Sequence, residues 1–143
     1  MASPSVADRY SATRSKEQFL YSDFLTNFNV HPDSKQFMTI KNEVAVTRSI
    51  KNLLLTNKYE RLFQPTIGSN LRNFLFEPIS PQTEASLKTQ IIRTIENHEP
   101  RAKLIDTVVT GYPEQNGYIV TIVFYTTTII NPITINIPLI RVR

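Results

Sequence analysis

Four ionisable side chains stand close together in residues 96–101, which read ENHEPR. Carboxylates and imidazoles are common protein ligands of metals, and a pair of carboxylates can perform general acid–base catalysis. An acid and an arginine can equally form an ion pair, or offer complementary charge to a partner protein. The segment therefore has four interpretations: a metal site, a catalytic site, a structural corner or a docking surface.

A metal site is disfavoured by the spacing of the candidate ligands. Glu96 and Glu99 are three residues apart and could share one helix face, with His98 nearby. The sequence has only two histidines, however, and the other one, His31, lies in a distant loop. It contains neither an HExxH motif nor an Asp-rich calcium loop. We therefore expect no metal and no cofactor.

A catalytic site is disfavoured as well. A glycosidase needs two carboxylates roughly 5–10 Å apart across a cleft, and Glu99 could be paired with Asp106 or Glu114. A chain with 12 acidic residues offers many such pairs, so the pattern has little specificity. The absence of cysteine and of a GxSxG motif, with only 3 glycines, excludes thiol nucleophiles and glycine-rich phosphate loops. We expect no enzyme, and keep a cell-wall hydrolase with Glu99 as general acid as an alternative.

The composition is that of one globular domain. The chain has 143 residues, of which 41% are hydrophobic and 20% charged, enough to bury a core. Residues 1–18 are polar and aperiodic and are predicted to form a flexible arm, with residues 19–143 as the single domain. No apolar run is long enough to predict a membrane span. The net charge of +4 is scattered, which favours surface charge over nucleic-acid binding, although a small basic nucleic-acid-binding module is a further alternative.

Apolar residues at helical spacing predict two helices. The first covers residues 42–56, with Asn42 as its N-cap. Its apolar stripe consists of Val46, Ile50, Leu53 and Leu54. The second covers residues 80–99, with Ser80 as its N-cap and Pro81 at the first helical position. Its apolar stripe consists of Leu87, Ile91, Ile92 and Ile95.

After residue 100 the period of the apolar pattern changes from that of a helix to that of a strand. Strands are predicted over residues 102–110, 118–130 and 133–143, joined by turns at Asn116-Gly117 and Asn131-Pro132. The fold class is therefore α+β, with N-terminal helices packed on a C-terminal three-stranded antiparallel β-meander.

The last predicted strand has one apolar face, which consists of Ile133, Ile135, Ile137 and Leu139. Pro138 cannot donate a ladder hydrogen bond, which predicts that this strand lies at a sheet edge. That edge is either covered within the subunit or open to pair with another chain by strand addition.

Several ordered pieces of this sequence resemble one protein family. They are YSDF at 21–24, NEVAVTRSIKNLLLTNKYERLFQPTIGSNL at 42–71 and ENHEPRAKLIDTVV at 96–109, followed by a strand hairpin. Together they resemble the GPW family of baseplate wedge proteins from phages with contractile tails, to which subunits of type VI secretion baseplates are related. The resemblance covers about residues 19–143. It implies a structural protein of the virion tail, made in the host cytoplasm, with no enzymatic activity and no small-molecule substrate.

The resemblance also implies which residues bind partners. The motif Glu99-Pro100-Arg101 is expected to contact the core helix bundle of larger wedge proteins. Members often have Gly-Glu-Arg at an earlier turn, where this chain keeps Glu60 and Arg61 but lacks the preceding glycine. The C-terminal strands resemble the strand-exchange platform of the tail sheath subunit. The strand that carries Ile133, Ile135, Ile137 and Leu139 is therefore expected to bind the tail sheath protein and initiate its polymerisation by β-strand addition.

Overall fold

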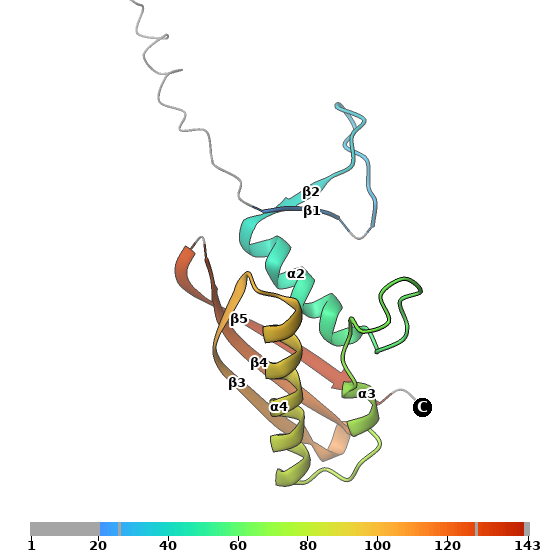
Figure 1. Ribbon diagram of the computed structural model, residues 1–143, viewed down its shortest axis with the longest axis vertical. Coiled ribbons are helices and arrows are strands. Elements are labelled where there is room, and N and C mark those ends of the chain that lie inside the picture. Colours follow the sequence, from blue (N-terminus) through green and yellow to red (C-terminus); the bar gives the residue numbers. More distant parts are fainter. Residues whose placement is uncertain (1–20, 26, 128, 142–143) are drawn as a thin grey trace, which may run out of the picture.

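The computed structural model describes residues 21–25, 27–127 and 129–141 (Figure 1). The arm predicted for residues 1–18 lies outside these residues. The first elements are β1 (Ser22–Phe24), β2 (Thr39–Lys41), α2 (Asn42–Leu55), α3 (Leu71–Phe74) and α4 (Pro81–His98). They are followed by β3 (Ala102–Tyr112), a 3-10 turn at Pro113–Gln115, β4 (Gly117–Thr126) and β5 (Ile129–Ile140).

Helix α2 buries the apolar stripe that the sequence predicts. Its buried residues are Ala45, Val46, Ile50, Leu53 and Leu54. The predicted cap is wrong by one residue, because the N-cap is Lys41 and Asn42 is the first helical residue, with a left-handed φ of 48°. The Asn42 amide donates to the Tyr21 carbonyl (2.9 Å), which ties the start of the helix to the segment before β1. Asparagine tolerates this backbone better than most residues do.

Helix α4 begins where the sequence predicts and ends within one residue of the predicted end. The Ser80 hydroxyl accepts a hydrogen bond from the Thr83 amide (3.2 Å), and Pro81 occupies the first helical position. The helix ends at His98, because Pro100 disfavours helical backbone at the residue before it. The buried residues of α4 are Thr83, Leu87, Ile91, Thr94 and Ile95.

The C-terminal strands form the predicted three-stranded antiparallel meander, in the order β3-β4-β5, so the α+β class is confirmed. Asn116 has a left-handed backbone (φ 47°) in the β3–β4 turn, as expected of a hairpin residue. The predicted turn at Asn131-Pro132 is wrong, because the ladder already pairs Thr126 with Ile129. Pro132 therefore lies inside β5, at an irregular stretch of the ladder that tolerates a missing amide donor.

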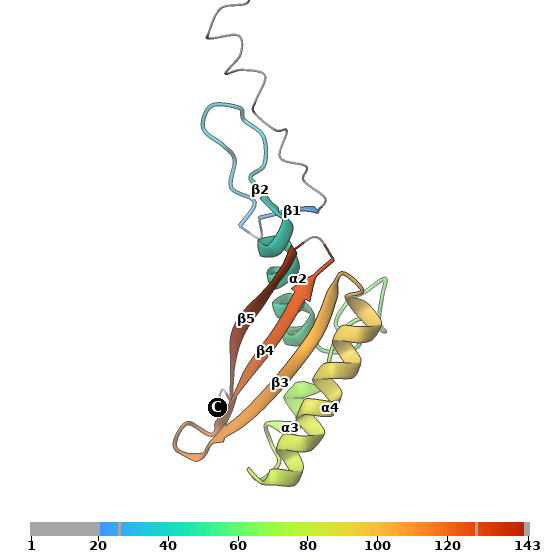
Figure 2. The ribbon, with the colours of Figure 1, turned by 90° about the vertical axis from the view of Figure 1, so that its left-hand side faces the viewer.

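The core lies between the helices and one face of the sheet. A single cluster of buried residues joins α2, α3 and α4 with the three strands. Its largest fully buried side chains are Phe124, Ile50, Leu87, Ile91, Ile95, Ile122 and Ile137. Figure 2 shows α4 running along the sheet, with α3 on the same side, while β1 and β2 extend beyond the N-terminal start of α2. Among the described residues, no helix combines the length and the hydropathy that a bilayer span needs.

Candidate functional site

The Glu99-Pro100-Arg101 corner connects the end of α4 to the start of β3. Its backbone is held on both sides, since the Glu99 amide donates to the Ile95 carbonyl (2.8 Å) and the Ala102 amide donates to the Glu99 carbonyl (3.1 Å). Pro100 lies between these bonds, is exposed, and restricts the backbone further. The side chains of Glu99 and Arg101 therefore leave the corner in defined directions.

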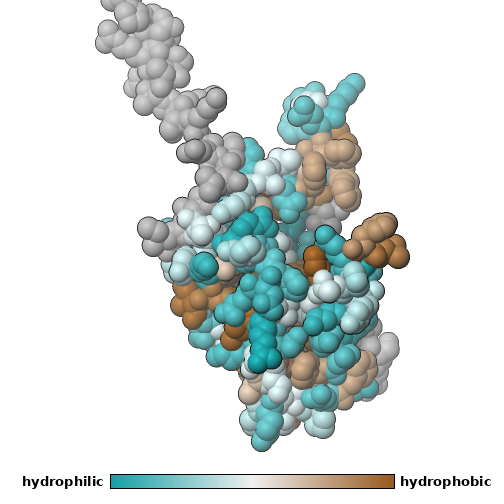
Figure 3. All heavy atoms as spheres, in the orientation of Figure 1, coloured by the Kyte–Doolittle hydropathy of each residue, from teal (hydrophilic) through white to brown (hydrophobic). Residues whose placement is uncertain are grey.

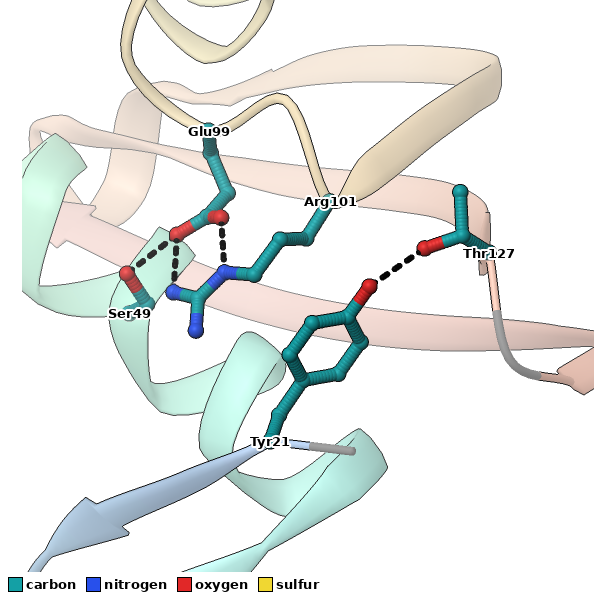
Figure 4. A network of polar contacts seen from close by, with 5 residues as sticks. All are labelled: Tyr21, Ser49, Glu99, Arg101 and Thr127. Carbon is teal, nitrogen blue, oxygen red and sulfur yellow. Dashed lines mark hydrogen bonds and ion pairs between the residues drawn. The ribbon is translucent and has the colours of Figure 1, made fainter. Parts of the chain in front are cut away.

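Glu99 is buried, with 3% of its surface exposed, and both of its carboxylate oxygens are bound (Figure 4). Arg101 donates from Nε to Oε1 at 2.5 Å and from Nη2 to Oε2 at 2.8 Å, which is the bidentate geometry that suits a guanidinium and a carboxylate. Ser49, in α2, also donates its hydroxyl to Oε2. The acid of the motif is thus held inside the subunit, and Arg101 is the more exposed member of the pair.

The protonation state of this pair follows from its contacts. Burial alone raises the pKa of the Glu99 carboxyl, but hydrogen bonds from Arg101 and Ser49 and the guanidinium charge outweigh it, so the pKa lies below its ordinary value of 4.5. The hydrogen bond to Glu99 likewise raises the pKa of Arg101. Both groups are therefore charged near neutral pH, and the corner contains an ion pair.

Tyr21 covers the guanidinium from another side. Cζ of Arg101 lies 5.5 Å from the centre of the Tyr21 ring, within the range of cation–π attraction. The Tyr21 hydroxyl lies 2.6 Å from Oγ1 of Thr127, in the turn after β4 (Figure 4). Sequence reasoning missed Tyr21, Ser49 and Thr127 as partners of this site, because the contacts join residues that are 50 and 106 positions apart. The one available signal was the place of Tyr21 in the YSDF piece.

A groove of about 200 Å³ opens beside this corner, and we name it the corner groove. Its lining comes from β1, α2, the loop after α2 and the end of α4. The lining residues are Asp23, Ser49, Asn52, Leu53, Thr56, Arg61, Ile67 and His98. Because Ser49 bonds Glu99 and His98 directly precedes it, the groove lies next to the buried ion pair.

The two residues expected from the earlier motif lie on different sides of one loop. Arg61 lines the corner groove. Glu60 lines a separate cavity of about 250 Å³ beside α3 and the end of β5, and its Oε2 accepts a hydrogen bond from the Asn57 amide (2.8 Å). The structure therefore brings Arg61 to the same groove as the corner, while Glu60 fixes the start of the loop.

Tyr59, which stands where the resemblance implies a glycine, has the left-handed backbone that glycine favours, with φ 69°. The turn therefore has the backbone conformation that a glycine would adopt. For a residue with a Cβ this conformation costs about 1 kcal/mol. The Tyr59 amide donates to the Pro65 carbonyl (2.9 Å), so the loop itself holds this conformation.

The predicted apolar face of β5 points to the core. Ile137 and Leu139 are buried, with 2% and 5% of their surface exposed, and Ile133 and Ile135 are half-buried. The alternation predicted from the sequence is confirmed, but these four side chains pack against the subunit's own core. β5 exposes the alternate side chains, Thr134, Asn136, Pro138 and Ile140, and the backbone of its outer edge.

The outer edge of β5 presents backbone groups that no other strand of the described residues uses. The Arg141 amide donates to the Asn116 carbonyl (3.4 Å), and the register then runs without interruption to the pair Phe124–Ile133. Because amide directions alternate along a strand, odd-numbered amides in this stretch bond β4 and even-numbered ones point outward. The outward donors are Thr134, Asn136 and Ile140. Pro138 belongs to the same set and has no N–H to donate.

The geometry of Glu99 does not suit a lysozyme-like reaction. A general acid must carry a proton at the working pH, which enzymes achieve by raising the pKa of the carboxyl group. Here the pKa of Glu99 is lowered, and both of its oxygens are occupied within the subunit. The arrangement suits a structural ion pair and not proton transfer to a substrate.

These features define a small α+β protein whose distinctive parts are a charged corner, a groove and a free sheet edge, as expected of a protein that works by assembly. The chain belongs to the baseplate wedge protein gp25 family, whose family model matches residues 41–127. The family expected from the sequence motifs is thereby confirmed.

Baseplate wedge protein gp25 of Enterobacteria phage T4 is 39% identical over an alignment of 72 residues, and the match covers 47% of this chain and 54% of the phage protein. The match thus spans about half the length of that relative. A candidate tail lysozyme from Geobacter sulfurreducens has a TM-score of 0.67 at 18% identity, over 74% of this chain and 97% of its own. A chain in the baseplate of the anti-feeding prophage has a TM-score of 0.61 at 20% identity, over 84% and 85%. At such identities these two structures establish the fold alone.

Proposed function

We propose that this chain is a structural subunit of the baseplate wedge in a contractile virion tail, where it docks on the helix bundle of larger wedge proteins and initiates the tail sheath. Membership of the wedge family supports this location. The observation that carries the docking role is the buried Glu99–Arg101 pair beside the corner groove. The pair fixes the direction of a partly exposed guanidinium before any partner binds.

The corner suits a partner that offers carboxylates or backbone carbonyls. Nε and Nη2 of Arg101 are bound by Glu99, and no acceptor among the described residues bonds Nη1. The Arg101 side chain keeps 31% of its surface exposed. A pre-oriented guanidinium loses less conformational entropy on binding than a free one. In this proposal Glu99 positions Arg101, and Arg101 contacts the wedge protein.

The second part of the proposal concerns the free edge of β5. Strand addition uses main-chain hydrogen bonds and makes few demands on side chains, which suits a polymer of repeating subunits. A strand of the tail sheath protein would bond the outward backbone groups of Thr134 and Asn136. The apolar residues of β5 contribute by holding the strand against the core, as the burial of Ile137 and Leu139 supports.

Replacing Asn136 by proline tests this edge without touching the core. The change removes one outward N–H and leaves the odd-numbered amides bonded to β4. Baseplates that carry Asn136→Pro are expected to contain complete wedges and to fail in sheath growth, as seen by electron microscopy. Thr134→Val is the matched control. It changes the side chain of a residue whose amide points outward, but it keeps that amide. The melting temperature of each purified variant checks that its fold is kept.

Two outcomes would contradict the proposal. Full sheaths on Asn136→Pro baseplates would refute the role of the edge. Normal baseplates in particles that lack this chain would refute the wedge role. Deleting the chain from Ile137 onward is a poorer test, because Ile137 and Leu139 belong to the core and the truncated domain would lose both.

A further inference from the structure

The loop between α2 and α3 carries the two most exposed large apolar side chains of the described residues. Leu62 and Phe63 expose 94% and 95% of their surface. In Figure 3 hydrophobic side chains gather on this projection, on the right of the molecule. Single exposed apolar residues are common, but two neighbours on a projecting loop offer a surface that a partner can remove from water.

The base of this loop is fixed by hydrogen bonds. The Ser69 amide donates to the Thr56 carbonyl (2.8 Å), and the Lys58 amide donates to the Ser69 carbonyl (3.2 Å). The buried Ser69 hydroxyl donates to the Leu54 carbonyl at the end of α2 (2.6 Å). The tip is therefore presented from a base that is tied into the fold.

Two backbone conformations in the loop are unusual. Gly68 has φ 137°, and a Cβ there would lie 2.8 Å from the Asn57 backbone, so that only glycine fits. Tyr59 keeps its left-handed backbone although it has a Cβ. Such conformations persist where the surrounding structure imposes them, and they cluster in segments that bind. The loop keeps these two conformations although Leu62 and Phe63 bury almost nothing within the subunit.

The surroundings of the tip indicate the chemistry of its partner. Arg61, next to Leu62, lines the corner groove, so the tip continues the surface proposed to dock on wedge proteins. Lys58 lies in the same loop, and Arg72 lines the cavity on its other side together with Glu60. Among the described residues none of these three cations has an ion pair, whereas the Glu60 carboxylate is bound to a backbone amide. The apolar tip is thus surrounded by these three cations, together with the carboxylates of Glu60 and, in the corner groove, Asp23.

We infer that Leu62 and Phe63 insert into an apolar pocket of the helix bundle that docks at the corner groove, and that carboxylates at the rim of this pocket face Arg61. The inference rests on the proposed docking function for the class of partner. It adds a second anchor, which acts through apolar burial, to the charged anchor at Arg101. The convex shape of the tip requires a concave partner surface, as in other interfaces centred on an aromatic side chain.

Phe63→Trp places a fluorescent reporter at this anchor, and the chain contains no other tryptophan that would contribute to the emission. The probe is the wedge complex of the same particle, purified without this chain. Binding is expected to shift the tryptophan emission to shorter wavelengths as the indole leaves water. Unchanged emission in the bound complex would overturn the inference. Tyr112→Trp, at the far end of β3, is the control and should keep its emission.

Leu62→Ser/Phe63→Ser measures how much the anchor contributes. Both side chains are almost fully exposed, so the fold should be unaffected. Affinity for the wedge complex is expected to fall about 100-fold, as is typical when two central apolar contacts are removed. Ile105→Thr/Val108→Thr, at exposed apolar residues of β3, should bind like the wild type. Equal binding by the serine variant would overturn the anchor and leave the corner intact, whereas no binding by the wild type would refute the proposed function together with the anchor.

Discussion

Ser49 donates its hydroxyl to the carboxylate of Glu99, a residue 50 positions further along the chain. This contact joins α2 to the end of α4, where the helices meet the sheet. Because Arg101 binds the same carboxylate, the corner contributes to the folded structure as well as to the proposed docking surface. We expect substitutions here to act on stability and on the proposed docking, and the two effects have to be measured separately.

Glu99→Gln should lower stability in a pH-dependent way. The folded-state pKa of Glu99 is depressed, so the carboxylate contributes stability above its ordinary pKa of 4.5, and this contribution is lost as the pH falls through the lower folded-state value. Near neutral pH we expect the free energy of unfolding to fall by about 1–3 kcal/mol. Urea denaturation at a series of pH values measures this difference, which should shrink in acid.

Glu96→Gln is the matched control for this experiment. Glu96 is exposed and stands one turn earlier on α4, so its replacement removes a charge without breaking the pair. Its effect should stay within about 0.5 kcal/mol. A penalty for Glu99→Gln that is the same in acid as at neutral pH would show that the ion pair is not its source.

Arg101→Ala should abolish docking, but it also leaves Glu99 buried without its partner, which weakens the fold. The variant Glu99→Gln/Arg101→Ala removes the buried charge too, and separates the two effects. We expect it to fold and to show no binding to the wedge complex in calorimetry. Arg101→Lys should bind weakly, since an ammonium group cannot make the bidentate contact. Normal wedge assembly by the double variant would mean that the corner is not a docking site.

The purified chain should not lyse peptidoglycan. The reason is that the carboxylate of Glu99 is buried, ionised and bound by Arg101 and Ser49. Turbidity of a cell-wall suspension measures the activity, with Glu99→Gln as the paired sample, and both proteins should be inactive. Lysis by the wild type that is lost in the variant would restore the hydrolase alternative.

Gly68→Ala and Tyr59→Gly should change stability in opposite directions. A Cβ at Gly68 would meet the Asn57 backbone at 2.8 Å, so we expect a loss of about 2 kcal/mol or more. Glycine at position 59 relieves the left-handed backbone of Tyr59 and should gain up to about 1 kcal/mol. Chemical denaturation of both variants checks this order, and a more stable Gly68→Ala protein would contradict the described loop geometry.

Features that depend on neighbouring residues could be predicted from the sequence. The cap at Ser80, the hairpin residue Asn116 and the alternation of β5 all follow local rules, and the structure contains each of them. The turn at Asn131-Pro132 could not be placed correctly, because this dipeptide is a strong turn signal while the irregular ladder lets the strand continue through it.

The candidate site was only partly accessible from the sequence. Glu99 and Arg101 are two positions apart, so their pairing is a local possibility. The burial of the pair is not local, because it depends on Ser49 and Tyr21, which reach it only after α2 and the segment before β1 have packed beside α4. The exposed tip of the 57–69 loop was missed for a similar reason, since exposure is a property of the folded surface.

Pro138 marks a fixed position on the open edge of β5, because it interrupts the series of outward amide donors. A strand added there can receive hydrogen bonds from the amides of Thr134 and Asn136 before the proline and of Ile140 after it, but from none at the proline itself. A slip by two residues, the smallest that keeps side chains on the same face, would place a different carbonyl opposite this gap. Under the proposed role in sheath initiation, the proline would fix the register of the added strand, and this register would set the height of the first sheath subunit and of those that follow.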